Sequence, residues 1–371
     1  MKLKDIVRES RETFKGDMSG VPVVGLEHLI PEEISFSEYE ISSDKTFTKA
    51  FHKGQVLFGR RRAYQKKAAI AHVDGVCSGD IMVLEAIPGK MEPSLLPFII
   101  QNDRFFDYAI QHSEGGLSPR VKWNAIANYE FSLPSIEEQK ILADKLWAAY
   151  RVKESYRQLL ATTDDMLKAK FNDMFGKTDF PKSKISDLLA DNFSGEWGED
   201  DVDGTGTSVI KTNNFNNDGS IDFTQLVTRN IEAKRVERKR LKAGDILLER
   251  SGGTKDNPVG RVVYFDREGI YVTNNFVQTL RVSDKVDSKF LFYSLFIFYN
   301  TQKMEIRRLG HQTSGIQNLD FHKFVAREVI VPSMEVQQEF AAIATQAEAT
   351  KASLRQSIDA IDRVIRSLIN Q

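Results

Sequence analysis

The chain has 371 residues, 41% hydrophobic and 28% charged, values typical of a globular protein with room for two or three domains. Its 51 basic and 52 acidic residues give a net charge of −1, which excludes a uniformly basic nucleic-acid-binding protein but not a local basic surface. The single cysteine, Cys77, excludes an internal disulfide, and residues 1–8 lack the apolar run of a signal peptide, so we expect a cytoplasmic protein.

The first 132 residues predict a mixed α/β domain. Short apolar or alternating runs, separated by glycines where turns are required, predict strands at residues 21–26, 55–58, 68–71 and 81–84. Residues 94–111 place apolar side chains at helical spacing and predict a helix. We therefore expect a domain over residues 1–132 built on a curled, mostly antiparallel sheet.

A long helix follows this domain. Residues 136–175 contain neither Gly nor Pro, and Ser135 and Glu138 have the spacing of a capping box at the helix start. At about 1.5 Å per residue such a helix is roughly 60 Å long. Because it carries apolar side chains along its whole length, it requires a partner helix. We assign residues 133–176 to this helical segment.

The chain repeats itself, and the repeat supplies the partner helix. Leu-Pro-Ser-Ile-Glu-Glu-Gln at residues 133–139 returns as Val-Pro-Ser-Met-Glu-Val-Gln at residues 331–337, a shift of 198 (331 − 133). We therefore expect a second domain at residues 177–330 and a second helical segment at residues 331–371. Residues 334–371 again lack Gly and Pro and carry a stripe, in steps of four and three, formed by Val336, Phe340, Ile343, Ala347, Thr350, Leu354, Ser357, Ile361, Val364 and Leu368.

The two copies share their apolar pattern but not their polar loops. Residues 53–60 align with residues 243–250, a shift of 190 (243 − 53). The loops that follow differ, with Arg-Arg-Arg-Ala-Tyr-Gln-Lys-Lys at residues 60–67 against Arg-Ser-Gly-Gly-Thr-Lys-Asp-Asn at residues 250–257. The pattern predicts one scaffold that carries two different sets of surface loops.

Patterns of catalytic and metal-binding residues are not evident. Residues 251–255 lack the spacing of a phosphate-binding loop, and the six histidines lack metal-ligand spacing. The acidic run at residues 196–203 has no His, Cys or EF-hand spacing and predicts a solvated loop, while residues 290–299 are too short to span a bilayer and predict a buried helix. The sequence therefore predicts no catalytic, cofactor or metal site, although a dispersed active site would leave no such pattern.

The loops instead combine residue types that read DNA. Basic side chains are concentrated at residues 49–67 and 234–242. Arg can bond two acceptors of guanine, Asn or Gln can pair with adenine, and Lys attracts phosphate. Each loop alone could be an ordinary solvated loop, but the combination occurs in both copies, so the candidate DNA-binding residues are Arg60, Arg61, Arg62, Tyr64, Gln65, Lys66, Lys67, Ser118, Arg120, Lys122, Asn213, Asn214, Arg250, Ser251, Thr254, Lys255, Asn257, His311, Gln312, Thr313, Gln317 and Asn318.

The whole chain resembles the specificity (S) subunit of type I restriction–modification enzymes. The resemblance rests on the repeated helix starts at residues 133–140 and 331–338, and on residues 54–67 followed by Asp-Gly-Val-Cys-Ser at residues 74–78. The family often has Arg-Pro-Tyr where this chain has Arg-Ala-Tyr at residues 62–64. The resemblance implies an α+β fold with two similar target-recognition domains, joined by two long antiparallel helices in a coiled coil with a pseudo-two-fold internal repeat.

The resemblance also implies partners. These are double-stranded DNA with a bipartite, asymmetric site, two modification subunits that methylate adenine with S-adenosylmethionine, and restriction subunits that use ATP and Mg. The S subunit itself would bind none of these cofactors, would not be an enzyme, would need no membrane and would serve in phage defence. Its helices would dock the modification subunits, with Ile358 and Ile365 as candidate contacts. A stand-alone DNA methyltransferase or endonuclease-type enzyme and a coiled-coil protein-binding adaptor remain alternatives.

Overall fold

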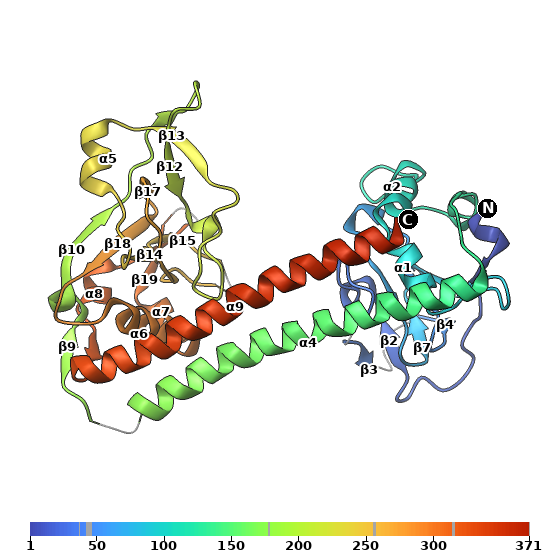
Figure 1. The fold of residues 1–371 in the computed structure, drawn as a ribbon, viewed down its shortest axis with the longest axis horizontal. Helices are drawn as coiled ribbons and strands as arrows, with labels where there is room; N and C mark the ends of the chain where they lie inside the picture. The colour runs from blue at the N-terminus through green and yellow to red at the C-terminus, as the bar shows by residue number, and fades with distance from the viewer. Residues whose placement is uncertain (37, 42–46, 177–178, 255–256, 314–315, 371) are drawn as a thin grey trace. The chain divides into compact units, whose positions relative to one another are not determined.

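The computed structural model describes residues 1–36, 38–41, 47–176, 179–254, 257–313 and 316–370 (Figure 1). The chain divides into a first unit, Met1–Arg157 with Arg355–Gln371, and a second unit, Gln158–Leu354. Each unit contains one α/β domain and a portion of both long helices, α4 (Ile136–Phe175) and α9 (Met334–Ile369). The two units are therefore described in turn.

The first unit is built from short strands followed by short helices. Its elements before α4 are η1 (Leu3–Asp5), β1 (Val7–Ser10), β2 (Pro22–Val24), η2 (Leu26–His28), β3 (Glu40–Ile41), β4 (Lys49–Phe51), β5 (Val56–Gly59), η3 (Ala63–Gln65), β6 (Ala68–Ile70), β7 (Gly75–Cys77), β8 (Ile81–Ala86), α1 (Leu96–Ile100), α2 (Asp103–Gln111) and α3 (Trp123–Ile126). The described strands form two sheets, ordered β1-β8-β5-β6 and β3-β2-β7-β4.

The second unit follows the same plan with additions. Its elements between α4 and α9 are β9 (Lys182–Lys184), η4 (Ile185–Leu188), β10 (Leu189–Ser194), β11 (Glu199–Asp200), β12 (Thr207–Ile210), η5 (Thr212–Asn214), β13 (Val227–Asn230), α5 (Ala233–Lys239), β14 (Ile246–Glu249), β15 (Ser251–Gly252), β16 (Val262–Tyr264), β17 (Tyr271–Thr273), β18 (Val277–Val282), α6 (Ser288–Thr301), α7 (Lys303–Arg308), β19 (Gly310–Thr313), β20 (Ile316–Leu319), α8 (Phe321–Val325) and β21 (Glu328–Ile330).

The strand order confirms the internal repeat. Sheet β10-β18-β14-β16 of the second unit matches β1-β8-β5-β6 of the first, and all pairs in both are antiparallel. Sheet β11-β13-β12-β17 contains the parallel pair β12/β17, as the first unit contains the parallel pair β2/β7. Gly54 and Gly244, 190 residues apart, both have a positive φ, 91° and 97°, at the turn before the equivalent strands β5 and β14.

The central sheet of the first unit is buried on both faces. Val56 and Phe58 of β5 pack into a core shared with α1 and α2, whereas Leu57 packs into a second core against β2 and β7. A strand with two buried faces reads as a continuous apolar run rather than an alternating one. This is why residues 55–58 were predicted to be a strand from an unbroken Val-Leu-Phe sequence, and the prediction is confirmed.

Both long helices begin with the same buried glutamine. Gln139, 2% exposed, donates from Nε2 to the Pro134 carbonyl and accepts the Glu92 amide proton on Oε1, at 2.9 Å each. Gln337, 1% exposed, does the same with the Pro332 carbonyl and the Asp287 amide, at 2.8 Å each. The repeated Pro-Ser-X-X-X-Gln sequence is therefore a clasp that joins each long helix to its domain.

The helices pack antiparallel through a seam with buried ion pairs. In the second unit Asp164 of α4 pairs with Lys351 of α9, and Phe171, seven residues further along α4, contacts Phe340, eleven residues earlier on α9. In the first unit Lys153 pairs with Asp362 at 2.8 Å. The members of the two pairs differ by 198 residues (351 − 153 and 362 − 164), so each helix supplies the lysine of one pair and the aspartate of the other.

The seam of α9 differs in phase from the predicted stripe. Its buried residues are Gln337, Phe340, Ala344, Ala347, Lys351 and Leu354, whereas Val364, placed in the stripe by its hydrophobicity, is 51% exposed. The polar residues of the clasp and the ion pair occupy seam positions because each has a hydrogen-bonding partner there. Ile365, proposed as an exposed docking residue, packs against the core of the first unit, and Ile358 is half-buried.

Other expectations are confirmed in outline. Ser135 and Glu138 form the predicted capping box, with Glu138 Oε2 accepting the Ser135 amide at 2.9 Å. The predicted helix at residues 94–111 is broken into α1 and α2 because the Asn102 side chain caps a new helix start by accepting the Arg104 amide. Residues 290–299 lie in the largely buried helix α6, and no described helix combines the length and hydrophobicity needed to cross a bilayer.

Candidate nucleic-acid interface

The loop at residues 60–67 of the first unit has a constrained backbone. It leaves β5, forms η3 and returns into β6, and its residues Arg62 and Lys66 have φ of 54° and 50° on either side of η3. Residues other than Gly rarely adopt this left-handed conformation, which costs of order 1 kcal/mol or more, so the surroundings must hold it in place. Such strain is concentrated at functional sites.

A second predicted segment supplies this support. Arg61 and Arg120 form an antiparallel bridge, the Arg62 amide donates to the Pro119 carbonyl at 2.8 Å, and the Val121 amide donates to the Arg60 carbonyl at 2.9 Å. Residues 60–62 and 118–121, predicted separately from the sequence, therefore lie side by side. Arg120 is paired on its other side with Glu114 through two backbone hydrogen bonds of 2.9 Å.

The side chains of this region converge on one carboxylate. Asp80 accepts a hydrogen bond from Arg120 Nε at 2.8 Å and from Arg61 Nη1 at 3.2 Å. Ser118 Oγ accepts from Arg61 Nη2 at 3.1 Å and from Arg62 Nη2 at 3.3 Å. Burial acts to raise the pKa of Asp80, but the two arginines outweigh it and hold the pKa below its ordinary value. We call these five residues the Asp80 cluster.

The remaining candidates of the first unit lie outside this cluster. Tyr64 is 54% exposed and Gln65 is half-buried. Lys66 pairs with Asp103, which raises the pKa of Lys66, and Lys122 pairs with Glu114 at 2.6 Å. Lys67 donates to the Leu26 carbonyl at 2.7 Å and so anchors its own loop. The three lysines are therefore already engaged within the unit.

In the second unit the matching segments form a small sheet ordered β15-β20-β19. Ser251 lies opposite Asn318, and Asn318 lies opposite His311, so these three side chains share one face. Ser251 Oγ donates to Asn318 Oδ1 at 2.7 Å, and Gln317 lies opposite Gly252. Lys255 and the side chains of Gln312 and Thr313 fall outside the part of the chain that the structure describes.

Arg250 leads into this sheet and is held from behind. Its Nη1 donates to Gln278 Oε1 at 3.3 Å, and the buried Gln278 donates in turn to Asn192 Oδ1 at 3.1 Å. In the following loop Thr254 and Asn257 close a turn, with the Asn257 amide donating to Thr254 Oγ1 at 3.0 Å. The structure thus brings Arg250, Ser251 and the strands β19 and β20 together.

Asn214 corrects the sequence prediction. It is 3% exposed, accepts the Lys211 amide at 2.9 Å and donates to the Gln225 carbonyl at 3.3 Å. Its amide closes the η5 turn and cannot reach a base, whereas its neighbour Asn213 is exposed. An Asn-Asn pair looks the same in sequence whichever member points inward.

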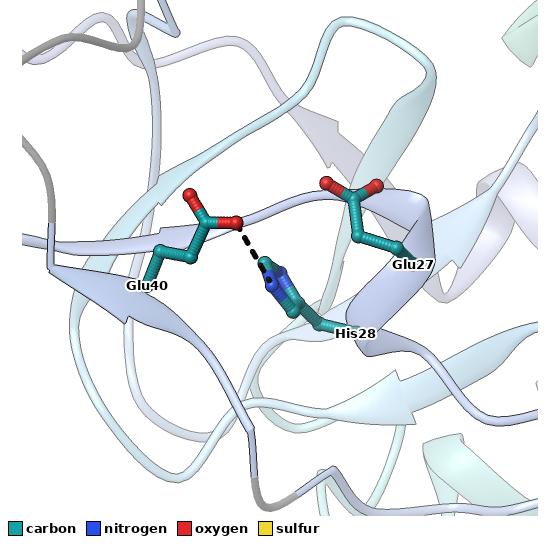
Figure 2. Close-up of side chains that lie close together, drawn as sticks. All are labelled: Glu27, His28 and Glu40. Atoms are coloured by element: carbon teal, nitrogen blue, oxygen red, sulfur yellow. Dashed lines mark ion pairs between the residues drawn. The ribbon is translucent and has the colours of Figure 1, made fainter. Parts of the chain in front are cut away.

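Glu27, His28 and Glu40 form a potential metal cluster, shown in Figure 2, whose ligand atoms lie within 4.8 Å of one another. His28 Nδ1 accepts the Gly25 amide at 2.9 Å, the same capping role that Asn214 plays in the second unit. The neutral ring therefore carries its proton on Nε2, which faces Glu40 Oε1 at 3.8 Å. A metal ion at Nε2 would require that proton to move and the Gly25 hydrogen bond to break. The cluster thus has the geometry of a capped turn beside an ion pair.

The second basic run is largely neutralised. Within α5, Arg235 and Lys239 pair with Glu196 at 2.8 and 3.0 Å, and the acidic run continues to Asp200, which pairs with Arg229. The pKa of Glu196 is lowered, chiefly by the hydrogen bond from Lys239. The acidic run at residues 196–203 was expected to be a solvated loop, but part of it lies against this helix.

Comparison with protein families decides the identity of the scaffold. A family model described as "Type I restriction modification DNA specificity domain" matches the chain twice, at residues 3–161 and 201–363. The chain belongs to this family. The two matches coincide with the two copies of the repeat, so each copy is one DNA specificity domain of a type I restriction–modification system.

Solved structures share the fold of this specificity-family chain. The whole chain aligns with a type I restriction–modification S subunit from M. genitalium at 10% identity and a TM-score of 0.59, covering 94% of that chain. It also aligns over its whole length with a chain from a structure on complex assembly and conformational transition of the type I R-M system, at 15% identity and a TM-score of 0.53, covering 96% of that chain. A comparison with curated protein sequences finds no match.

Two features of the specificity-family chain were missed at the sequence level. Asp80 is the acceptor that organises Arg61 and Arg120, yet it lies 19 residues from one and 40 from the other. In the second unit Glu249, 2% exposed, pairs with Arg261, which also donates to the Thr212 carbonyl at 3.2 Å and so joins β14 to the η5 turn. The available signal was a single acidic residue beside a basic run, which is common in any loop.

Proposed function

We propose that the chain is the DNA sequence-specificity subunit of a type I restriction–modification complex and recognises a bipartite, asymmetric double-stranded site. Residues 1–132 and 177–330 are the two target-recognition domains, and residues 133–176 and 331–371 are the helical segments that carry them. The S-adenosylmethionine, ATP and Mg of the reaction belong to the modification and restriction subunits, and the chain itself does no chemistry.

One observation carries this proposal: the same backbone bridge holds different side chains in the two units. Arg61 is paired with Arg120 in the first unit, and Ser251 is paired with Asn318 in the second. Residues 120 and 318 differ by 198, the shift of the repeat. Equivalent scaffolds that present arginine in one unit and hydroxyl and amide groups in the other are suited to two unlike half-sites.

The chemistry of the loops supports recognition rather than catalysis. The groups of the Asp80 cluster hydrogen-bond one another and offer donors, as expected for base and phosphate contacts. The one thiol is unsuited to nucleophilic attack, because burial raises the pKa of Cys77 to about 12 and keeps it protonated at neutral pH.

The outer face of α4 is the best surface for docking the modification subunits. Ile141, Val152, Leu159 and Met166 are between 43% and 56% exposed, and their separations of 11, 7 and 7 residues place them on one side of the helix. Exposed apolar side chains in a continuous stripe are typical of protein interfaces.

Mapping methylated adenines tests the proposal directly. The full chain is co-expressed with its modification subunits, and methylation is read across a genome. We expect two short conserved half-sites separated by a fixed gap of unread bases. Sequence-independent methylation, or methylation without this chain, would refute the proposal.

Two further measurements separate the alternatives. DNA affinity should fall steeply between 50 and 200 mM salt if phosphates are contacted. Binding of S-adenosylmethionine by the isolated chain would indicate a stand-alone enzyme. Absence of DNA binding at every salt concentration would indicate a protein-binding adaptor.

A further inference from the structure

The Asp80 cluster has a geometry that goes beyond general DNA binding. Asp80 receives Nε of Arg120, and no other described residue accepts a hydrogen bond from the Arg120 side chain. The opposite edge of that guanidinium, with Nη1 and Nη2, therefore keeps its donors available, and the side chain is 46% exposed. Arg61 differs, because Asp80 and Ser118 take its two terminal nitrogens.

Arg120 is also held in position by its backbone. Its amide and carbonyl both bond to Glu114, and the residues on either side of it bond to Arg62 and Arg60. A guanidinium fixed at Nε and at the backbone loses little conformational entropy when it binds a ligand. Such fixation is useful for a contact that depends on direction, and unnecessary for attraction to phosphate.

The charge of Asp80 favours a base over a phosphate as the target of Arg120. A carboxylate 2.8 Å from Arg120 Nε repels a phosphate placed beside the same guanidinium. The major-groove edge of guanine is uncharged and presents two acceptors, O6 and N7, at the spacing of the two terminal nitrogens of arginine. Adenine and thymine pair one acceptor with a donor or a methyl group there, so they cannot receive both hydrogen bonds.

The second unit lacks this arrangement at the equivalent place. The Arg60 amide donates to the Asp80 carbonyl, and the Arg250 amide donates to the Phe276 carbonyl, so Phe276 stands where Asp80 stands. Phe276 is 41% exposed, and Asn318 takes the position of Arg120. A fixed arginine fork is therefore a property of the first unit.

We propose that Arg120 reads a guanine in the half-site bound by the first unit and that Asp80 is the positioning residue that sets this specificity. The inference rests on the proposed function and adds the chemical identity of one base. Arg61 and Ser118 complete the support, since Arg61 bonds to both Asp80 and Ser118.

Selection from a randomised duplex pool tests the inference. The full chain assembled with its modification subunits is compared with the Arg120→Lys and Asp80→Asn variants, and base preference is measured at every position of both half-sites. Arg120→Lys keeps the charge but loses the fork, so we expect the preference for guanine at one position to fall about ten- to a hundredfold. Asp80→Asn should weaken the preference at that same position by a smaller factor, and neither change should alter the other half-site.

Glu85→Gln is the matched control. Glu85 accepts from Arg8 Nε at 3.0 Å in the same unit, so it is a carboxylate–arginine pair outside the reading loops, and its loss should leave every base preference unchanged. Should Arg120→Lys retain the wild-type preference at all positions, Arg120 is a phosphate contact and the inference is wrong while the proposed function stands. A wild-type complex with no base preference at all would instead remove the proposed function.

Discussion

The two units hold equivalent reading loops by different means. In the first unit the loop after β5 is held at its surface by the partly exposed Asp80 cluster and by the left-handed residues Arg62 and Lys66. In the second unit the loop after β14 is held from below, by the buried pair Glu249–Arg261, and it turns at Gly252 and Gly253, whose φ values are 121° and 67°. The strands and the helix clasps are the same in both. The scaffold thus tolerates a change of loop as long as each loop brings its own support.

The largest difference between the units is expected on removal of their buried charges. Glu249→Ala leaves the Arg261 guanidinium without its carboxylate in a site where Glu249 is 2% exposed, and should destabilise the second unit by about 3–5 kcal/mol. Urea unfolding measures the loss. Glu85→Ala removes an exposed pair of the first unit and should cost below about 1 kcal/mol; equal losses in the two variants would contradict the comparison.

The helix ion pairs should respond alike, because they are copies. Asp164→Ala leaves Lys351 buried without a partner, and Asp362→Ala does the same to Lys153, whose side chain is 8% exposed and which retains only Glu33 at 3.8 Å. Each change should cost about 3 kcal/mol by thermal or urea unfolding. A loss confined to one of the two variants would show that the repeat is structural in sequence only.

The glutamine clasps offer a smaller and equally symmetrical test. Gln139→Ala and Gln337→Ala each leave a buried amide and a buried carbonyl unpaired, so we expect about 1–3 kcal/mol for each. Amide hydrogen exchange at Glu92 and Asp287, which lose their acceptors, provides a local measurement. Unchanged protection at both amides would contradict the clasp.

The smallest effect is a pH dependence restricted to the first unit. The pKa of Asp80 is lowered, so its contribution to stability is complete above the unfolded pKa of about 3.9 and is lost as the pH falls through the folded value. Phe276 occupies this place in the second unit and does not titrate. An NMR titration of the Asp80 carboxyl should give a midpoint below 3.9, and a midpoint above it would show that Arg61 and Arg120 do not hold the carboxylate.

Local patterns were sufficient for the scaffold. The repeat of Pro-Ser-X-X-X-Gln, the absence of Gly and Pro in α4 and α9, and the apolar run of β5 predicted elements that the structure confirms. Two predicted loop segments, residues 60–62 and 118–121, do lie together. The contacts of the candidate residues with DNA remain predictions.

The phase of the α9 seam could not be read in the same way. Hydrophobicity places Val364 in the seam and Lys351 outside it, yet the lysine is buried because Asp164 of the other helix pairs with it. Asn214 and Asn213 likewise differ only in which of them meets the Lys211 amide. A polar residue becomes a seam or core residue when a distant partner satisfies it, and the partner is not its neighbour in the chain.

By itself the sequence determined the duplication, the two long helices and the order of the strands, because these depend on side-chain periods and turn residues that act over a few positions. Only the tertiary structure decided that Asp80 meets Arg61 and Arg120, that Lys153 meets Asp362, and that His28 caps a turn. These contacts join residues whose separation along the chain carries no local signal. The folded backbone alone brings their atoms within hydrogen-bonding distance.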